Sequence, residues 1–303
     1  MKFDRSLQAD TGVDVRLSPL LSRLLAPNPG PFTFKGTGVY ILGAGSDVAV
    51  IDPGPDMPQH IEALKRALGS RRVSHILVTH THRDHSPAAA ALKAWSGAKT
   101  YGLPLASRAS PPGAGEGMVD EAHDHDFIPD IPVHDGMQIE GEGFTLDCVI
   151  TPGHTANHVC YALREEYALF SGDHVMGWST SVIAPPDGDM GQYLASLKKL
   201  NARDDKIFYP THGSPVANPK QWLDQLIAHR YKREGQILAA LEQGPQTVSE
   251  LVEKLYPILD PSLRPAAAQQ VVAHLAHLEA KGLTVPDEKN AGVFRSEIRG
   301  RMP

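Results

Sequence analysis

The sequence predicts an α/β protein with a small helical unit at its C-terminus. Short apolar runs typical of strands alternate with helix-like segments up to about residue 215. Histidine and aspartate side chains, which can bind metal ions, follow several of these runs. After Pro219 the pattern changes to long amphipathic helices. We therefore expect two domains, residues 1–220 and 221–303, with helices covering the sheet faces of the first.

The N-terminal elements can be assigned in order. The first thirty residues contain several prolines, and we expect them to cover the body and lead into the first strands. Val39–Leu42 and Val48–Ile51 predict a hairpin, because a glycine-rich turn joins them. Gln59–Leu68 predicts a helix that ends at Gly69.

Further along, Ile76–Val78 is typical of a buried strand. Ser86 and Pro87 then predict the N-cap and first turn of a helix, since proline has the required φ and needs no N–H donor there.

The C-terminal unit has the element order of a winged helix. Trp222–Leu241 predicts a long amphipathic helix, and Thr247–Glu250 fits a capping box that opens a second. A third helix is expected from Pro265 to Lys281, and Leu283–Phe294 fits a small hairpin.

A metal site is indicated by the run Thr79–His85, which reads THTHRDH. His80, His82, Asp84 and His85 are metal-ligand types in a tight link between a strand and a helix. His80 and His82 are two residues apart, so in an extended segment their rings project to one side. Asp84 and His85 lie past a turn and can reach a second point, so one segment would serve two adjacent ions.

Three later segments offer the missing ligands. Each is a short apolar strand followed by a potential ligand beside small turn residues. These ligands are His154, Asp173 and His212.

In the order of these seven residues the chain resembles the metallo-β-lactamase-fold hydrolases, over roughly residues 30 to 215. The resemblance implies an αββα sandwich with the metals at one edge, between the sheets. It implies a first ion held by His80, His82 and His154. It implies a second ion held by Asp84, His85 and His212. Asp173 would bridge the two ions, and Asp52, which ends an early strand, also matches.

Nitrogen and carboxylate ligands suit zinc, with iron or manganese as alternatives. We expect two divalent ions that share a hydroxide, which attacks an ester, thioester or related bond. Asp84, His85 and Asp173 would act in catalysis, with Asp84 orienting the hydroxide and taking its proton. Asp52 would hold the loop of His80 and His82 through hydrogen bonds.

Trp178, Ser179 and Thr180 follow Asp173 closely, and we expect them to contact substrate. Trp178 would offer a flat wall and the hydroxyls a hydrogen-bond donor. A packing role for Trp178 is the alternative. His123–Asp126 also has metal-like spacing, but it follows no apolar strand. We interpret it as a solvated acidic segment that borders the mouth of the site.

The tail, with Arg230, Arg233 and Glu234 ahead of the winged-helix pattern, is similar to the β-lactamase-like protein 2 group. That group includes an endoribonuclease on single-stranded RNA and glyoxalase-II-like hydrolases. RNA is therefore an alternative substrate to a small molecule. Residues 223–303 carry as many acidic as basic side chains, which favours a packing or dimer-forming unit over a nucleic-acid surface. A non-catalytic, metal-stabilised binding or regulatory protein is the alternative outside enzymes.

No run of about 20 apolar residues predicts a membrane span. Met1–Arg5 lacks the apolar core of a secretory signal. Cys148 and Cys160 lie in apolar, strand-like surroundings, as buried thiols do. We therefore expect a cytoplasmic protein.

Overall fold

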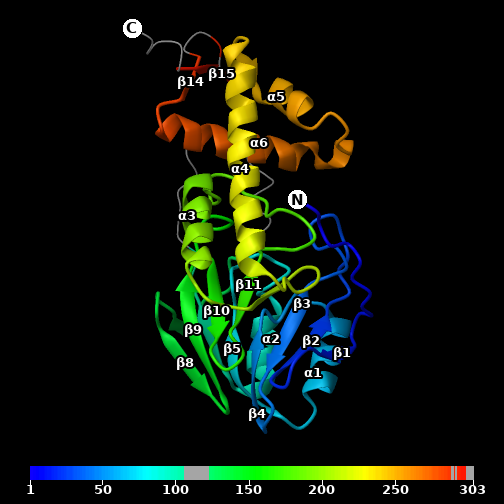
Figure 1. Cartoon of the computed structure of the whole chain (residues 1–303). Helices are drawn as coiled ribbons and strands as arrows, with labels where there is room; N and C mark the ends of the chain where they lie inside the picture. The colour runs from blue at the N-terminus through cyan, green and yellow to red at the C-terminus, as the bar shows by residue number, and fades with distance from the viewer. Residues whose placement is uncertain (106–122, 288–289, 291, 298–303) are drawn as a thin grey trace.

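The computed structural model describes residues 1–105, 123–287, 290 and 292–297. Two sheets packed face to face form the larger part of the molecule (Figure 1). The first sheet has seven strands in chain order, antiparallel from β1 to β4 and parallel from β4 to β7. They are β1 (Asp14–Arg16), β2 (Leu21–Leu25), β3 (Gly38–Leu42), β4 (Asp47–Ile51), β5 (Arg72–Leu77), β6 (Lys99–Gly102) and β7 (Ile131–Pro132).

The predicted hairpin is present as β3 and β4. The expectation for the first thirty residues is wrong at β2, whose five residues are all buried between β1 and β3. Arg23 interrupts its apolar run and hides the strand in the sequence. In the fold that guanidinium donates to the Gly213 carbonyl at 2.9 Å.

The second sheet has five strands in the order β12-β11-β10-β9-β8. Its pairs are antiparallel except for β11 and β12, which are parallel. The strands are β8 (Gln138–Gly141), β9 (Phe144–Ile150), β10 (Val159–Leu163), β11 (Ala168–Gly172) and β12 (Ile207–Pro210).

Three apolar layers hold this body together. Residues such as Tyr40, Leu146 and Phe170 fill the space between the sheets. On the outer faces, α1 (Pro58–Leu68) and α2 (Ala88–Ser96) cover the first sheet, and α3 (Met190–Asn201) and the start of α4 (Pro219–Glu242) cover the second. The expected αββα sandwich is confirmed.

The starts of α1 and α2 can be compared with the helix starts predicted from the sequence. Helix α1 begins one residue before the expected Gln59 and ends, as expected, at Gly69 with φ 60°. The expected cap of α2 is wrong, because the N-cap position is Pro87 and the Ser86 hydroxyl instead donates to Asp124 at 2.7 Å. The Ser86 hydroxyl, which the local pattern predicted would cap the helix, is used instead in a contact with a distant residue.

The C-terminal unit is a winged helix, as expected. Thr247 and Glu250 form the predicted capping box, and a three-stranded sheet has the order β13-β15-β14. Its elements are β13 (Gln246–Thr247), α5 (Val248–Leu255), a 3-10 turn (Pro261–Leu263), α6 (Arg264–Ala280), β14 (Thr284–Pro286) and β15 (Val293–Ser296).

Helix α4 joins the two parts of the molecule (Figure 1). Leu223 and Leu226 near its start pack into the outer layer of the sandwich, whereas Ile237 and Leu241 lie in the winged-helix core. In the described part of the chain, every helix is too short or too polar to cross a bilayer.

Candidate metal centre

The candidate ligands gather where strands of both sheets end. His80, His82, Asp84 and His85 follow β5, and Asp52 follows its parallel neighbour β4. Asp173 and His212 follow the parallel pair β11 and β12, and His154 lies in the turn between β9 and β10. Because parallel strands end at the same edge, residues far apart in the chain meet there.

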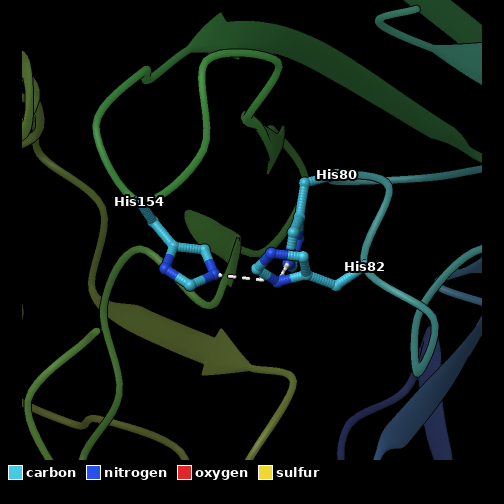
Figure 2. Close-up of side chains that lie close together, drawn as sticks. All are labelled: His80, His82 and His154. Atoms are coloured by element: carbon cyan, nitrogen blue, oxygen red, sulfur yellow. Dashed lines mark hydrogen bonds between the residues drawn. The ribbon is translucent and has the colours of Figure 1, made fainter. Parts of the chain in front are cut away.

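Three histidines form what we call the histidine cluster: His80, His82 and His154. Figure 2 shows their rings facing one another, with His82 Nδ1 2.9 Å from His80 Nε2 and 3.2 Å from His154 Nε2. One ring nitrogen from each of the three lies within 4.8 Å of the others.

Asp84, His85 and His212 form a second group, the carboxylate cluster. His212 Nε2 lies 3.1 Å from Asp84 Oδ2, and His85 Nε2 lies 3.4 Å from the same oxygen. Asp173 lies between the clusters. Its Oδ1 is 3.4 Å from His212 Nε2, and its Oδ2 is 3.9 Å from His154 Nε2. Each of its oxygens therefore approaches one cluster.

The outer ring nitrogens have fixed acceptors. His154 Nδ1 lies 2.6 Å from the Val182 carbonyl, His212 Nδ1 3.2 Å from the Gly36 carbonyl, and His85 Nδ1 3.0 Å from Asp52 Oδ2. A proton on Nδ1 leaves a lone pair on Nε2, and in all three rings Nε2 faces the clusters.

This arrangement fits divalent metal ions. His85 Nε2 and Asp173 Oδ1 are buried and make no hydrogen bond to any residue that the structure describes. Buried polar atoms without a hydrogen bond are costly, and an ion between the ligands would satisfy both.

The two clusters differ in their affinity for protons. Burial, reinforced by neighbouring rings, holds the pKa values of His80 and His82 well below normal, and burial lowers the pKa of His154. Burial also opposes a charge on His85, yet Asp84 and Asp173 raise its pKa well above normal. For His212, burial also opposes the charge, but Asp173 and Asp84 together outweigh it and raise the pKa to about 10.

Asp52 anchors the segment that carries His80, His82, Asp84 and His85. Its carboxylate accepts hydrogen bonds from the Thr79 amide at 2.7 Å, the Thr79 hydroxyl at 2.8 Å and the Thr211 hydroxyl at 2.9 Å. With the His85 contact it ties together residues next to His80 and next to His212. Asp52 therefore supports the loop of His80 and His82 indirectly, through its hydrogen bonds to Thr79. Its direct contact with a candidate ligand is to His85.

A cavity of about 460 Å³ opens over both clusters, with His82, His154, Asp84 and His212 among its lining residues. This is within the usual size range of small-molecule sites. The three residues expected to contact substrate, Trp178, Ser179 and Thr180, all lie on its wall. Trp178 stacks on Phe34, with ring centroids 4.8 Å apart and planes 13° apart. Phe32, Ala266 and Gln269 also line the cavity, and no local sequence pattern pointed to them.

The interpretation of His123–Asp126 as a solvated segment is wrong in its first half. His123 is buried, lines the cavity and packs against His82 with ring centroids 4.7 Å apart and planes tilted by 46°. The Asp124 amide donates to the Thr81 carbonyl at 2.7 Å, so the segment pairs with the ligand loop. His125 and Asp126 are exposed, and the segment does border the site, as expected.

Comparison with known families agrees with this geometry. Residues 33–212 match the metallo-beta-lactamase superfamily, and residues 247–292 match the beta-lactamase associated winged helix domain. The chain belongs to the metallo-beta-lactamase superfamily. This confirms the resemblance inferred from the ligand motif, and with it the expected hydrolase class of enzyme.

Several superfamily members match most of the chain. An atrochrysone carboxyl ACP thioesterase of Paecilomyces divaricatus is 34% identical over 251 residues, which cover 80% of this chain and 73% of the relative. A beta-lactamase-like protein 2 homolog of Caenorhabditis elegans is 31% identical over 286 residues, covering 88% and 87%. The crystal structure of a metallo-beta-lactamase family protein from Thermus thermophilus superposes with a TM-score of 0.78 at 25% identity, covering 93% of this chain and 100% of that one.

Proposed function

We propose that this protein is a binuclear metal-dependent hydrolase whose substrate is a thioester. The observation that carries the proposal is the position of Asp173, with one oxygen toward each ligand cluster, at the floor of a cavity with an apolar wall. The Paecilomyces relative, named as an acyl-carrier-protein thioesterase, supports the choice of bond. Zinc is our first expectation for both ions, with iron or manganese as alternatives.

The ligand roles follow the two clusters. His80, His82 and His154 would hold one ion, and Asp84, His85 and His212 the other. Asp173 would bridge them. When bound, two divalent ions lower the pKa of water from about 15.7 toward about 7 and polarise the scissile carbonyl.

Asp84 has the geometry to handle the proton in this reaction. Its side chain is 25% exposed, so it reaches the cavity, while the other carboxylate cluster members are buried. The Thr37 hydroxyl donates to Asp84 Oδ2 at 3.1 Å and so holds that oxygen. We propose that Asp84 orients the attacking water, takes its proton as the water adds to the carbonyl carbon, and returns a proton to the leaving sulfur as the C–S bond breaks.

The cavity wall favours an apolar acyl group over a polyanion. Phe32, Met176, Trp178 and Val182 contribute its apolar surface. Arg83 is the single lysine or arginine among the described lining residues, and Asp187 adds a carboxylate beyond the ligand set. Beyond the metal ligands, Arg83 alone of the residues described on this wall offers the basic charge that a phosphate backbone needs along its length, so we place RNA behind thioesters.

The test is a reconstitution screen. Metal-free protein is loaded separately with zinc, manganese or iron and assayed on N-acetylcysteamine thioesters, lactones, phosphodiesters and short RNAs. We expect metal-dependent turnover of the thioesters that is lost in Asp84→Ala and retained in Asp126→Ala, a substitution of an exposed aspartate. Protein that holds two ions but turns over another bond class faster, or none, would overturn the proposal.

We also propose the division into residues 1–220 and 221–303, a boundary that leaves the first two residues of α4 in the first part, and its first turns do pack on the sandwich.

A further inference from the structure

The carbonyl of Ser181 is held by two helices at once. Arg230 Nη2 on α4 donates to it at 2.6 Å, and Gln270 Nε2 on α6 donates to it at 3.1 Å. Arg230 Nη1 also donates to Gln270 Oε1 at 2.8 Å, which closes a triangle of hydrogen bonds. Figure 1 shows α4 running from the sandwich to the winged helix, with α6 lying across it. The loop that carries Ser181 is thus fastened where the two parts of the molecule meet.

Arg230 is an unusual residue to bury at this place. Its side chain is 2% exposed, and within the described ranges it forms no ion pair with a carboxylate. Its other contact is the face of the Tyr193 ring, 5.0 Å from the guanidinium carbon. Burying a guanidinium among neutral partners is costly. Arg230 Nε makes no hydrogen bond to a described residue, so the bonds from Nη1 and Nη2 and the contact with the Tyr193 ring must offset that cost.

Ser181 connects this triangle to both sides of the metal centre. The next residue, Val182, accepts the hydrogen bond from His154 Nδ1 at 2.6 Å. The Ser181 hydroxyl donates at 2.9 Å to the carbonyl of His174, which follows Asp173. Tyr193, under the guanidinium, donates to the same hydroxyl at 3.4 Å.

We propose that Arg230, with Gln270, is a positioning residue for the metal centre and the substrate wall. It acts through the Ser181 carbonyl. Holding this carbonyl positions the neighbouring Val182 carbonyl, which accepts the hydrogen bond from His154, and also positions residues 178–180 on the cavity wall. Gln269, the neighbour of Gln270, lines the cavity. One helix of the winged-helix domain therefore holds the loop and closes the substrate site. The inference deepens the proposed function, since it rests on His154 as a metal ligand.

The test compares Arg230→Met with Arg233→Met on the same helix. Arg233 is also partly buried. Among the described residues it contacts Gln236 on α4, the Leu255 carbonyl at 3.0 Å and the Tyr256 ring, all in the C-terminal part of the molecule. Two readouts are used: hydrogen–deuterium exchange of the peptide covering residues 177–184, and zinc affinity by competition with a chromogenic chelator.

We expect Arg230→Met to speed exchange in residues 177–184 at least tenfold and to weaken zinc binding about tenfold, the lower end of the range for groups that orient a ligand. Arg230→Lys should recover part of both. Arg233→Met should change neither.

Exchange and affinity unchanged in Arg230→Met, or changed equally in both methionine variants, would overturn the inference. If Arg230→Met does not fold, Gln270→Leu can be used instead, because it removes one donor to the Ser181 carbonyl. We expect it to change exchange and zinc affinity in the same direction by a smaller factor. Wild-type protein that binds none of zinc, manganese and iron would defeat the proposed function, while the exchange data would still decide whether Arg230 fixes the loop.

Discussion

Lowering the pH should remove metal from the two ligand clusters unequally. In the metal-free protein the rings of the histidine cluster have lowered pKa values and are neutral at pH 7. In the carboxylate cluster, His85 and His212 have raised pKa values and are protonated at pH 7. A ligating histidine must be neutral. An ion that binds the carboxylate cluster must therefore displace protons from its histidines, whereas an ion that binds the histidine cluster finds neutral rings.

The size of the effect follows from His212. Its folded pKa of about 10 lies about three units above pH 7, which corresponds to a cost of about 4 kcal/mol, or a factor of about 1000 in affinity. Each displaced proton makes affinity for the second ion rise about tenfold per pH unit until the pH reaches that pKa. The stability of the metal-free protein has the opposite dependence. Protonated His212 stabilises it fully below pH 6.5, and this stabilisation is lost as the pH rises through about 10.

Two measurements check this. Metal content after dialysis against limiting zinc should approach one ion per chain at pH 6 and two at pH 8.5. Calorimetric titration in buffers of different ionisation enthalpy should show proton release with the second ion and little with the first. His212→Ala should abolish the second binding event and leave the first. If both ions left with the same midpoint, or if the second bound without releasing protons, the assignment of proton states would be wrong.

Four further predictions concern single side chains and the tail. Asp173→Ala should lower metal content and activity together, and a variant that keeps both at wild-type levels would refute its bridging role. Trp178→Ala should raise the KM for an aromatic thioester several-fold with kcat little changed; an unchanged KM with lower stability would mean that the ring only packs on Phe34. Asp52→Ala leaves four buried donor groups without their acceptor and should lower the free energy of unfolding in urea by about 3 kcal/mol or more. The matched change at exposed Asp56 should stay within about 0.5 kcal/mol, and equal losses would contradict the anchoring role. The electrically neutral winged helix should give no salt-sensitive gel shift at micromolar protein with single-stranded RNA or duplex DNA, so a shift that weakens with salt would restore the nucleic-acid alternative.

Local patterns predicted much of the architecture. The β3–β4 hairpin, α1 with its terminal Gly69, and the capping box at Thr247 each depend on residues close together in the chain. The same holds for the position of every ligand directly after a strand. Where such patterns failed, a distant segment intervened: Ser86 bonds to Asp124 rather than to its own helix, and β2 is buried despite its arginine because β1 and β3 flank it.

The family, the ligand types and their order could all be read from the amino acids, because metal ligation requires particular side chains and strand ends mark where they can gather. The three-dimensional packing was needed to show that Asp173 lies between the clusters, that His123 is buried against His82, and that α6 of the winged helix lines the cavity over the clusters. It was also needed to bring Arg230 to Ser181, 49 residues earlier in the chain. These contacts join segments that no local pattern relates, and the packing of two sheets and a linking helix sets the distance between them.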